Sequence, residues 1–362
     1  MIKKALIGTY LIVAICFFLS FGEGHPVSGA NSGYMERVFV SGYGEVTVVD
    51  PAKPEVVASI KVNGPVRDLS FTKDGKKALA LANGRTSLYV IDTLGNKVID
   101  EIKLTGRTDN GLLDRRVWGS AISPDGSKAY AFVTQGEKRT NIFKVLPSKI
   151  LEIDLGTKEV VRSVEAPYGI HVLQWKPDDS NTVFVWGYDL YTLDVKEMKL
   201  SLLHGIKHPQ KPEDGIGNYL LIWPRSHTGF NSFPLVKSYP DGRVTEGLLW
   251  FNLKTEELKT LEFDKDPVGM FSAAVDRNQQ YGYVVLNHLY KVDMKTGKVL
   301  KDSHPPHGST YAIDLSADET KLYLAGGGNE FIVANTELQV EKIITLPTDG
   351  WDLQVVKIDK QQ

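Results

Sequence analysis

The sequence predicts an all-β protein, a seven-bladed β-propeller of four-stranded antiparallel blades, from three observations. A run of alternating apolar residues closed by Asp or Asn occurs seven times, as VTVVD, LYVID, ILEID, LYTLD, LWFN, LYKVD and FIVAN. A polar turn and a second apolar run, such as VVASIKV (56–62), follow it. The closing residues are 42, 62, 40, 58, 41 and 42 positions apart; they are Asp50, Asp92, Asp154, Asp194, Asn252, Asp293 and Asn335. A recurrent spacing near 40 with β patterning is typical of one blade per repeat.

Within each blade we name the strands A to D from the ring axis outward. The A–B turn is predicted at 123–126 (SPDG), 72–75 (TKDG) and 316–319 (SADE), because Asp bonds back to the backbone and Gly accepts a positive φ. Strand B follows this turn, as in KALALA (77–82). Strand C ends at the closing Asp or Asn, whose side chain is expected to cap the C–D turn.

The two ends of the fold are predicted to share one blade. The first repeat opens with RVFVSG (37–42), which reads as strand B, and no strand A precedes it. The last repeat is followed by a surplus segment, GWDLQVVKID (350–359). We expect residues 351–358 to supply strand A of the first blade, which would remove two open sheet edges.

Residues 1–30 are predicted to be a signal peptide, and residues 31–362 to be a single propeller domain. Two lysines precede an apolar run from Ala5 to Phe21, and Ser28-Gly29-Ala30 offers a small-residue cleavage site. The run is long for a signal, so an uncleaved N-terminal anchor is the alternative. We therefore expect export across the inner membrane and a periplasmic protein, without stable membrane insertion after cleavage.

Composition excludes several kinds of chemistry from the expected mature chain. Cys16 is the only cysteine and lies in the leader, which leaves no disulfide, thiol nucleophile or C-x-x-C-H haem attachment. A formal charge of −2 favours neither nucleic acid nor an anionic membrane as a partner. H-E-x-x-H, G-x-S-x-G and P-loop motifs are missing from the sequence. We predict no catalytic, cofactor-binding or metal-binding residues in this chain.

Four motifs have a structural interpretation that we prefer to a functional one. Asp114-Arg115-Arg116 leads into a strand A and is read as a surface salt bridge rather than a site that binds a partner carboxylate. His304 and His307 flank two prolines and are read as part of a D–A loop rather than a metal pair. Gly326–Gly328 is read as a tight B–C turn rather than a phosphate cradle. Trp118, Trp175 and Trp223 stand at strand-A positions, where packing between blades is expected.

Four segments exceed the repeat template: 105–117, 135–148, 204–216 and 238–246. The first and third join strand D to the next strand A, and the second and fourth join B to C. Both kinds of connection lie on the same face of a propeller, so the insertions are predicted to build a docking surface there. Neutral loop drift, which would scatter insertions over both faces, is the alternative. The residues predicted for this partner face are Arg107, Asp109, Asp114, Arg115, Arg116, Lys138 and Arg139.

The middle and end of the chain resemble the β subunit of quinohaemoprotein amine dehydrogenases, a propeller of the YVTN-repeat type. The matching segments are GSAISPDGSKAYAF (119–132), ILEIDLGTKEVVRSVEAP (150–167), DGIGNYLLIWPRSHTGFNSFPLVKSY (214–239), EGLLWFNLKTEEL (246–258) and HPPHGSTYAIDLSADETKLYLAGG (304–327) with ITLP (344–347). The atypical fifth blade and the insertion positions discriminate this family, because the repeat motifs alone are shared by all YVTN-type propellers.

The resemblance implies a periplasmic heterotrimer that oxidises primary amines to aldehyde and ammonia. In that family a small γ subunit carries cysteine tryptophylquinone and an α subunit carries two c-type haems. The propeller carries no cofactor; it scaffolds the γ subunit and helps to wall the amine pocket. The alternative is a stand-alone periplasmic YVTN-type propeller that binds a ligand or partner or acts as a lactonase-like hydrolase. The heavy chain of methylamine dehydrogenase, also a cofactor-free propeller, is a third possibility.

Overall fold

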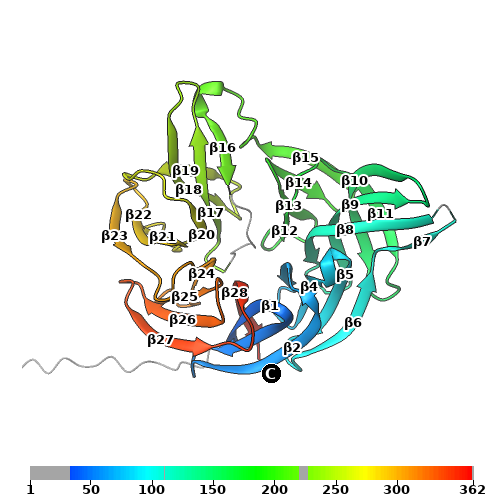
Figure 1. The fold of residues 1–362 in the computed structure, drawn as a ribbon, viewed down its shortest axis with the longest axis horizontal. Helices are drawn as coiled ribbons and strands as arrows, with labels where there is room; N and C mark the ends of the chain where they lie inside the picture. The colour runs from blue at the N-terminus through cyan, green and yellow to red at the C-terminus, as the bar shows by residue number, and fades with distance from the viewer. Residues whose placement is uncertain (1–32, 110, 220–226, 361–362) are drawn as a thin grey trace, which may run out of the picture. The chain divides into compact units, whose positions relative to one another are not determined.

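The computed structural model describes residues 33–109, 111–219 and 227–360, which form seven antiparallel β-sheets arranged as blades around a central axis (Figure 1). The predicted seven-bladed propeller is therefore confirmed. The predicted signal peptide and Trp223 lie outside the described residues. Within the described part of the chain, no helix is long and apolar enough to cross a membrane.

The blades follow one another in chain order, and each runs from an inner to an outer strand. Blade 2 comprises β3 (Asp68–Phe71), β4 (Lys77–Ala82), β5 (Ser87–Asp92) and β6 (Lys97–Lys103). Blade 3 comprises β8 (Gly111–Ile122), β9 (Lys128–Lys138), β10 (Phe143–Asp154) and β11 (Val160–Glu165), with β7 (Gly106–Thr108) added beside β8. Blade 4 comprises β12 (Val172–Trp175), β13 (Thr182–Trp186), β14 (Leu190–Asp194) and β15 (Lys199–His204).

The remaining blades repeat the same plan. Blade 5 comprises β16 (Ile216–Tyr219), β17 (Phe230–Ser238), β18 (Val244–Asn252) and β19 (Leu258–Glu262). Blade 6 comprises β20 (Met270–Val275), β21 (Tyr281–Leu286), β22 (Leu289–Asp293) and β23 (Val299–Ser303). Blade 7 comprises β24 (Ala312–Leu315), β25 (Lys321–Ala325), β26 (Glu330–Asn335) and β27 (Val340–Thr345). Two single-turn 3₁₀ helices, η1 (Asn83–Arg85) and η2 (Pro212–Asp214), lie in connections.

Blade 1 is closed by the C-terminal strand, as predicted. Its sheet contains β28 (Gly350–Asp359), β1 (Tyr34–Asp50) and β2 (Glu55–Pro65). The first half of β1 pairs with β28 and the second half pairs with β2. Arg37 and Asp50 form an ion pair of 3.2 Å, although thirteen residues of straight strand would separate them by roughly 43 Å. The chain therefore turns back near Gly44 (φ 80°), and β1 supplies both strand B and strand C.

Every strand C ends as the sequence predicts. In all seven blades the closing Asp or Asn accepts a hydrogen bond from the backbone N–H two residues later; the seven donors are Ala52, Leu94, Gly156, Lys196, Lys254, Lys295 and Glu337. The A–B turns are confirmed as well. Gly75 donates to the Thr72 carbonyl over 2.9 Å and Gly126 to the Ser123 carbonyl over 2.8 Å. These side-chain caps satisfy the backbone groups that a tight turn leaves unpaired.

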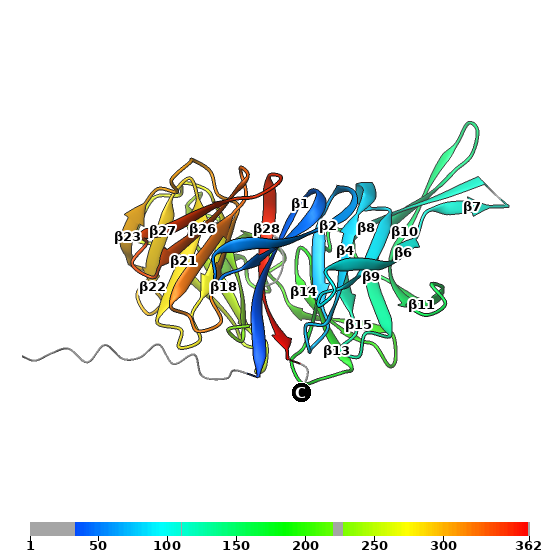
Figure 2. The ribbon, with the colours of Figure 1, turned by 90° about the horizontal axis from the view of Figure 1, so that it is seen from below.

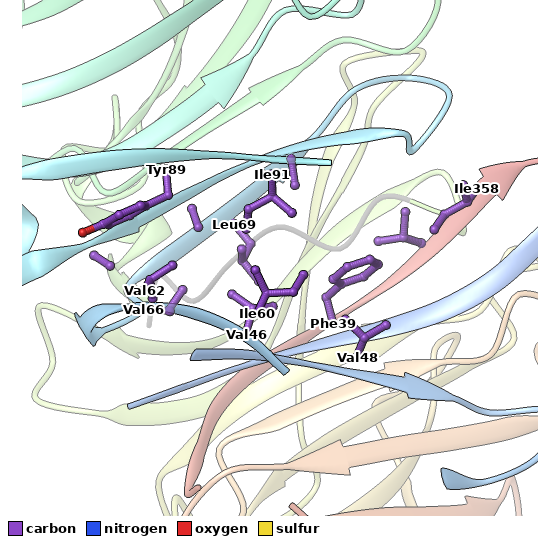
Figure 3. Packing of buried hydrophobic residues seen from close by; sticks show 14 residues of the cluster. Phe39, Val46, Val48, Ile60, Val62, Val66, Leu69, Tyr89, Ile91 and Ile358 are labelled. Carbon is purple, nitrogen blue, oxygen red and sulfur yellow. The ribbon is translucent and has the colours of Figure 1, made fainter. Parts of the chain in front are cut away.

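The hydrophobic core consists of seven clusters, and each cluster joins two neighbouring blades. Figure 3 shows the cluster between blades 1 and 2, where Phe39 and Ile60 of blade 1 pack near Leu69 and Ile91 of blade 2. Each blade therefore buries both of its faces against neighbours, which explains why its strands B and C are apolar on both sides.

Polar side chains of the inner strands add bonds between blades near the axis. Asp68 on β3 accepts hydrogen bonds from the backbone N–H of Ser120 on β8 over 2.6 Å and from its hydroxyl over 2.9 Å. Ser70 accepts a hydrogen bond from the N–H of Ile122 over 3.1 Å. Gln354 on β28 donates to the carbonyl of Leu69 over 2.7 Å. These hydrogen bonds between inner strands hold successive blades together around the central axis.

Candidate functional site

The first two insertions form one extension of blade 3, which projects from the ring (Figure 2). We call this extension, residues 105–117 and 135–148, the arm. Its strands are β7 and the outer parts of β8, β9 and β10, paired in that order. Register shifts between Val117 and Gly119 and between Leu146 and Lys149 mark its base. The sequence analysis treated these segments as long connections, whereas the structure makes them strands that continue the blade outward.

The strand register brings four predicted partner residues to one face of the arm. Arg107, Leu112, Lys138 and Phe143 stand opposite one another in a row across the four strands. Asp114, Gly136 and Val145 form the next row on the same face. Directly opposite residues in a sheet share a face, and positions two apart along a strand return to it. Arg116, two positions after Asp114, therefore belongs to this face too. We call this side the arm face.

The other three predicted residues take different places. Arg115 points to the opposite side of the arm, since it follows Asp114 by one position, and its Nε donates to the side-chain oxygen of Gln135 over 3.2 Å. Burial lowers the pKa of Arg115. Asp109 lies in the turn after β7. Arg139 is in the turn after β9 and its guanidinium lies 3.2 Å from the carboxylate of Glu137.

Arg116 and Asp114 hold the base of the arm in place. The two side chains form an ion pair with an N–O distance of 2.8 Å. Arg116 also donates to the carbonyl of Gly84 over 2.9 Å, which links the arm to the B–C turn of blade 2. These two residues therefore form the surface salt bridge that the sequence analysis preferred for them, and Arg107 and Lys138 are the other exposed cations of the arm face.

The sequence analysis missed the apolar part of the arm. Ile142, Phe143 and Val145 are 63%, 58% and 77% exposed. Gly136 leaves room for the Phe143 ring, because a Cβ on this glycine would lie 2.2 Å from the ring. The outer part of β10 also has a free edge, since β11 pairs with β10 only from Lys149 inward. The run NIFKVL (141–146) does not alternate between apolar and polar residues, so the sequence carried no period-2 signal for this strand.

The other two insertions join their blades in different ways. Residues 238–246 are a tight extension of the β17–β18 hairpin, in which Gly242 donates to the carbonyl of Tyr239 over 3.0 Å. Residues 204–216 are held by Asp189, which accepts backbone N–H bonds from Ile206, Lys207 and His208. Burial alone would raise the pKa of Asp189, but the hydrogen bonds from the His208 ring and these backbone groups lower it below the usual value. The sheet order gives all four insertions the D–A or B–C positions expected for one face.

Cations stacked on indole rings line the inner-strand ends on this face of the ring. The guanidinium of Arg85 lies 4.2 Å from the ring centre of Trp118, and that of Arg67 lies 4.8 Å from the ring centre of Trp351. Burial and the neighbouring Arg67 lower the pKa of Arg85, and burial and Arg85 lower the pKa of His171. His171 is therefore neutral at pH 7, and the positive charge here belongs to the arginines.

The remaining motifs that the sequence analysis singled out lie in loops, turns and blade contacts of the described structure. His304 lies in a D–A loop, and its Nδ1 is 2.9 Å from the carbonyl of Asn287. Gly326 and Gly327 turn with positive φ of 99° and 80° between β25 and β26. Trp175 of blade 4 packs edge-on against Tyr130 of blade 3, with ring centres 5.5 Å apart. Across residues 33–109, 111–219 and 227–360 no group of three or more His, Cys, Asp or Glu side chains is placed to hold a metal ion.

Comparisons with known proteins support the fold. No protein-family model matches the chain, and no curated protein sequence matches it either. Solved structures with the same architecture include hydrazine synthase from Kuenenia stuttgartiensis, with 17% identity over 84% of this chain and 90% of that chain and a TM-score of 0.53. AztD from Citrobacter koseri in its apo form is 12% identical over 91% of this chain and 100% of that chain, with a TM-score of 0.53. A functionally unknown protein from Desulfotomaculum acetoxidans is 12% identical over 90% of this chain and 100% of that chain, with a TM-score of 0.55. These neighbours are similar in their seven-bladed propeller fold.

Proposed function

We propose that this chain is a propeller subunit without a cofactor of its own, which binds a partner protein through the arm face. The observation that carries this proposal is the exposed strand edge at Phe143 and Val145, with Lys138 directly opposite Phe143 and Arg107 in the same row on the far strand β7. Apolar and aromatic side chains in contact with solvent, together with arginine, are typical of the centre of a protein interface. A partner with an apolar patch bordered by carboxylates would complement this surface.

The more specific proposal rests on the sequence resemblance. It makes the chain the β subunit of a periplasmic quinohaemoprotein amine dehydrogenase. Its partners would be a small γ subunit that carries cysteine tryptophylquinone and an α subunit that carries c-type haem. Primary amines would be oxidised to aldehyde and ammonia on the γ subunit. The propeller would scaffold that subunit and wall the amine pocket, while the electrons leave through the haem chain.

The test is purification of the tagged chain from its own host, followed by mass spectrometry and by assay of amine-dependent dye reduction. Recovery of a dihaem chain and a small quinone chain, with amine-dependent activity, supports the full proposal. A different partner held through the arm supports docking and contradicts the amine dehydrogenase assignment. A colourless monomer contradicts both and favours a stand-alone propeller.

The arm face is tested by a double variant, Phe143→Ser with Val145→Ser. Truncating two exposed side chains should leave the melting temperature unchanged, whereas hot-spot positions of this kind cost about 2 kcal/mol or more in binding, at least about thirtyfold in affinity. Lys144→Ser is the matched control, because Lys144 lies between them on β10 and points to the opposite side of the arm. Arg107→Glu with Lys138→Glu should slow association. Equal partner recovery by all variants would refute docking through this face.

A further inference from the structure

A cavity of about 530 Å³ lies beside the ring axis on the face opposite the arm. It is bounded by the inner strands β3, β12 and β28 and by the A–B turns of blades 2 to 4. Small-molecule sites occupy volumes of roughly 300–1,000 Å³. The cavity is therefore large enough for an organic ligand of moderate size, and it is separate from the surface assigned to the partner.

Three residues that line this cavity each have a buried nitrogen atom without a hydrogen-bond partner among the described residues; these atoms are Gln174 Nε2, Trp175 Nε1 and His227 Nε2. Gln174 is only 6% exposed, and the side chain of His227 is 8% exposed. The side-chain oxygen of Gln174 already accepts a hydrogen bond from Asn231 over 2.9 Å, which leaves its NH₂ group to donate elsewhere. A buried donor without a partner costs about 1–3 kcal/mol, so these atoms favour a bound acceptor.

The chemistry of these atoms determines one half of the ligand. The indole N–H of Trp175 and the amide NH₂ of Gln174 can only donate hydrogen bonds. His227 Nε2 can donate or accept a hydrogen bond, according to the tautomer of the ring. Nδ1 of the same ring lies 3.6 Å from the Asp314 carboxylate. A ligand that satisfies this site must therefore present a hydrogen-bond acceptor, for which a carbonyl-type oxygen is suited because it can accept two hydrogen bonds.

The side chains that line the cavity determine the polarity and charge of the rest of the ligand. Apolar side chains from three inner strands line the cavity; they include Leu69, Phe71, Leu173, Val355 and Val356. Three charged groups at the rim are held in ion pairs: Lys73 lies 2.7 Å from Asp178, and Lys176 lies 2.5 Å from Glu256. Of the other two, Asp179 accepts the backbone N–H of Asn181, and Lys357 lies 5.0 Å from the ring centre of Tyr34. A charged ligand would have to draw one of these groups from its present contact, and burial of an unpaired charge is costly.

We propose that the axial cavity binds an uncharged, partly apolar molecule that presents a carbonyl-type oxygen to Gln174 and Trp175. This site does not depend on the partner proposal, because it lies on the opposite face and uses none of the arm residues. The ligand would occupy the apolar wall with its hydrocarbon part and satisfy the two donors with its oxygen.

The probe set for the test is acetophenone, benzoate, 1-phenylethylamine and toluene, applied to the protein purified from its own host. These molecules share one aromatic ring and differ in carrying a neutral carbonyl, a carboxylate, an ammonium group or no polar group. Saturation-transfer NMR measures the Kd of each. Saturable acetophenone binding that is at least about tenfold tighter than binding of the other three supports the proposal, and this ranking needs no variant. Absence of saturable binding, or equal or tighter binding of a charged probe, overturns it.

Substitution places the binding at the cavity. Trp175→Phe retains an aromatic ring and removes the N–H, so acetophenone binding should weaken about threefold to tenfold. Trp186→Phe is the matched control, because Trp186 Nε1 is also buried without a partner but the residue lies in the core between blades 4 and 5, away from the cavity. Thermal melts show whether both variants fold. Equal effects of the two substitutions would overturn the assignment of the site.

Discussion

The pKa values of individual carboxyl groups in this propeller shift in opposite directions according to their surroundings. Asp125 at a solvent-facing turn accepts hydrogen bonds from the Ser123 hydroxyl and from the N–H of Ser127, and these bonds lower its pKa. Asp68 lies between two inner strands, and its burial raises its pKa to about 7, although two hydrogen bonds from Ser120 and the charge of Arg85 oppose that rise. One residue type therefore caps turns where it is solvated and joins blades where it is buried.

The raised pKa of Asp68 predicts a pH dependence of stability. Between pH 3.8, its ordinary pKa, and about 7, the folded state holds a proton that the unfolded state has released. Folding stability should therefore fall as pH rises through this window, on the order of 4 kcal/mol for a shift of about three pKa units. Asp68→Asn should remove this fall. Urea unfolding at pH 5 and pH 8 covers about two of these three units, so the measured fall should be about 2.7 kcal/mol.

Asp125→Asn is the control for that experiment. The pKa of Asp125 is lowered, so the carboxylate is ionised in both states above pH 5 and its loss should cost the same at both values. An Asp68→Asn protein that keeps the wild-type difference between pH 5 and pH 8 would contradict the role assigned to Asp68.

At the scale of elements, the turn chemistry made most of the fold predictable. The closing Asp or Asn and the A–B turn residues act through local hydrogen bonds, which are visible in sequence order. The arm was not predictable as strands, because its outer half is exposed on both faces and shows no burial pattern that marks a blade. The donors at the axial cavity were not predictable either, since Gln174 and His227 come together only when separate blades close the ring.

The ring-closing strand β28 carries a prediction about stability. Ending the chain at residue 349 removes pairing along Tyr34–Gly42 of β1 and the buried side chains of Leu353, Val355, Val356 and Ile358. Each buried aliphatic side chain is worth about 1.5–3 kcal/mol, so the sum is similar to the whole stability of a typical domain. The truncated chain should show no cooperative melting transition by circular dichroism.

The control for this truncation removes only residues 360–362, which follow β28. That chain should melt like the full-length protein. A chain ending at residue 349 that retained the wild-type midpoint would show that β28 does not close the ring energetically.

At the scale of the whole molecule, the proposed partner surface and the proposed ligand cavity lie on opposite faces of the ring. The D–A and B–C connections carry the arm and the stacked arginines, whereas the A–B turns surround the axial cavity. The inner strands separate the two faces, so the proposed ligand and the proposed partner would not compete for the same residues. The seven core clusters make this possible, because each is shared by two blades and no blade has a core of its own.

Shared cores predict that a local defect destabilises the ring as one unit. Phe39 is 1% exposed in the cluster between blades 1 and 2, and Phe39→Ala should cost about 3–5 kcal/mol. Four of the six tryptophans, Trp118, Trp175, Trp186 and Trp250, lie in blades 3 to 5, so fluorescence reports mainly on distant blades. Urea unfolding curves from fluorescence and from far-ultraviolet circular dichroism should coincide and shift together. A fluorescence midpoint that stays at the wild-type value while the circular dichroism curve splits would mean that the blades unfold separately.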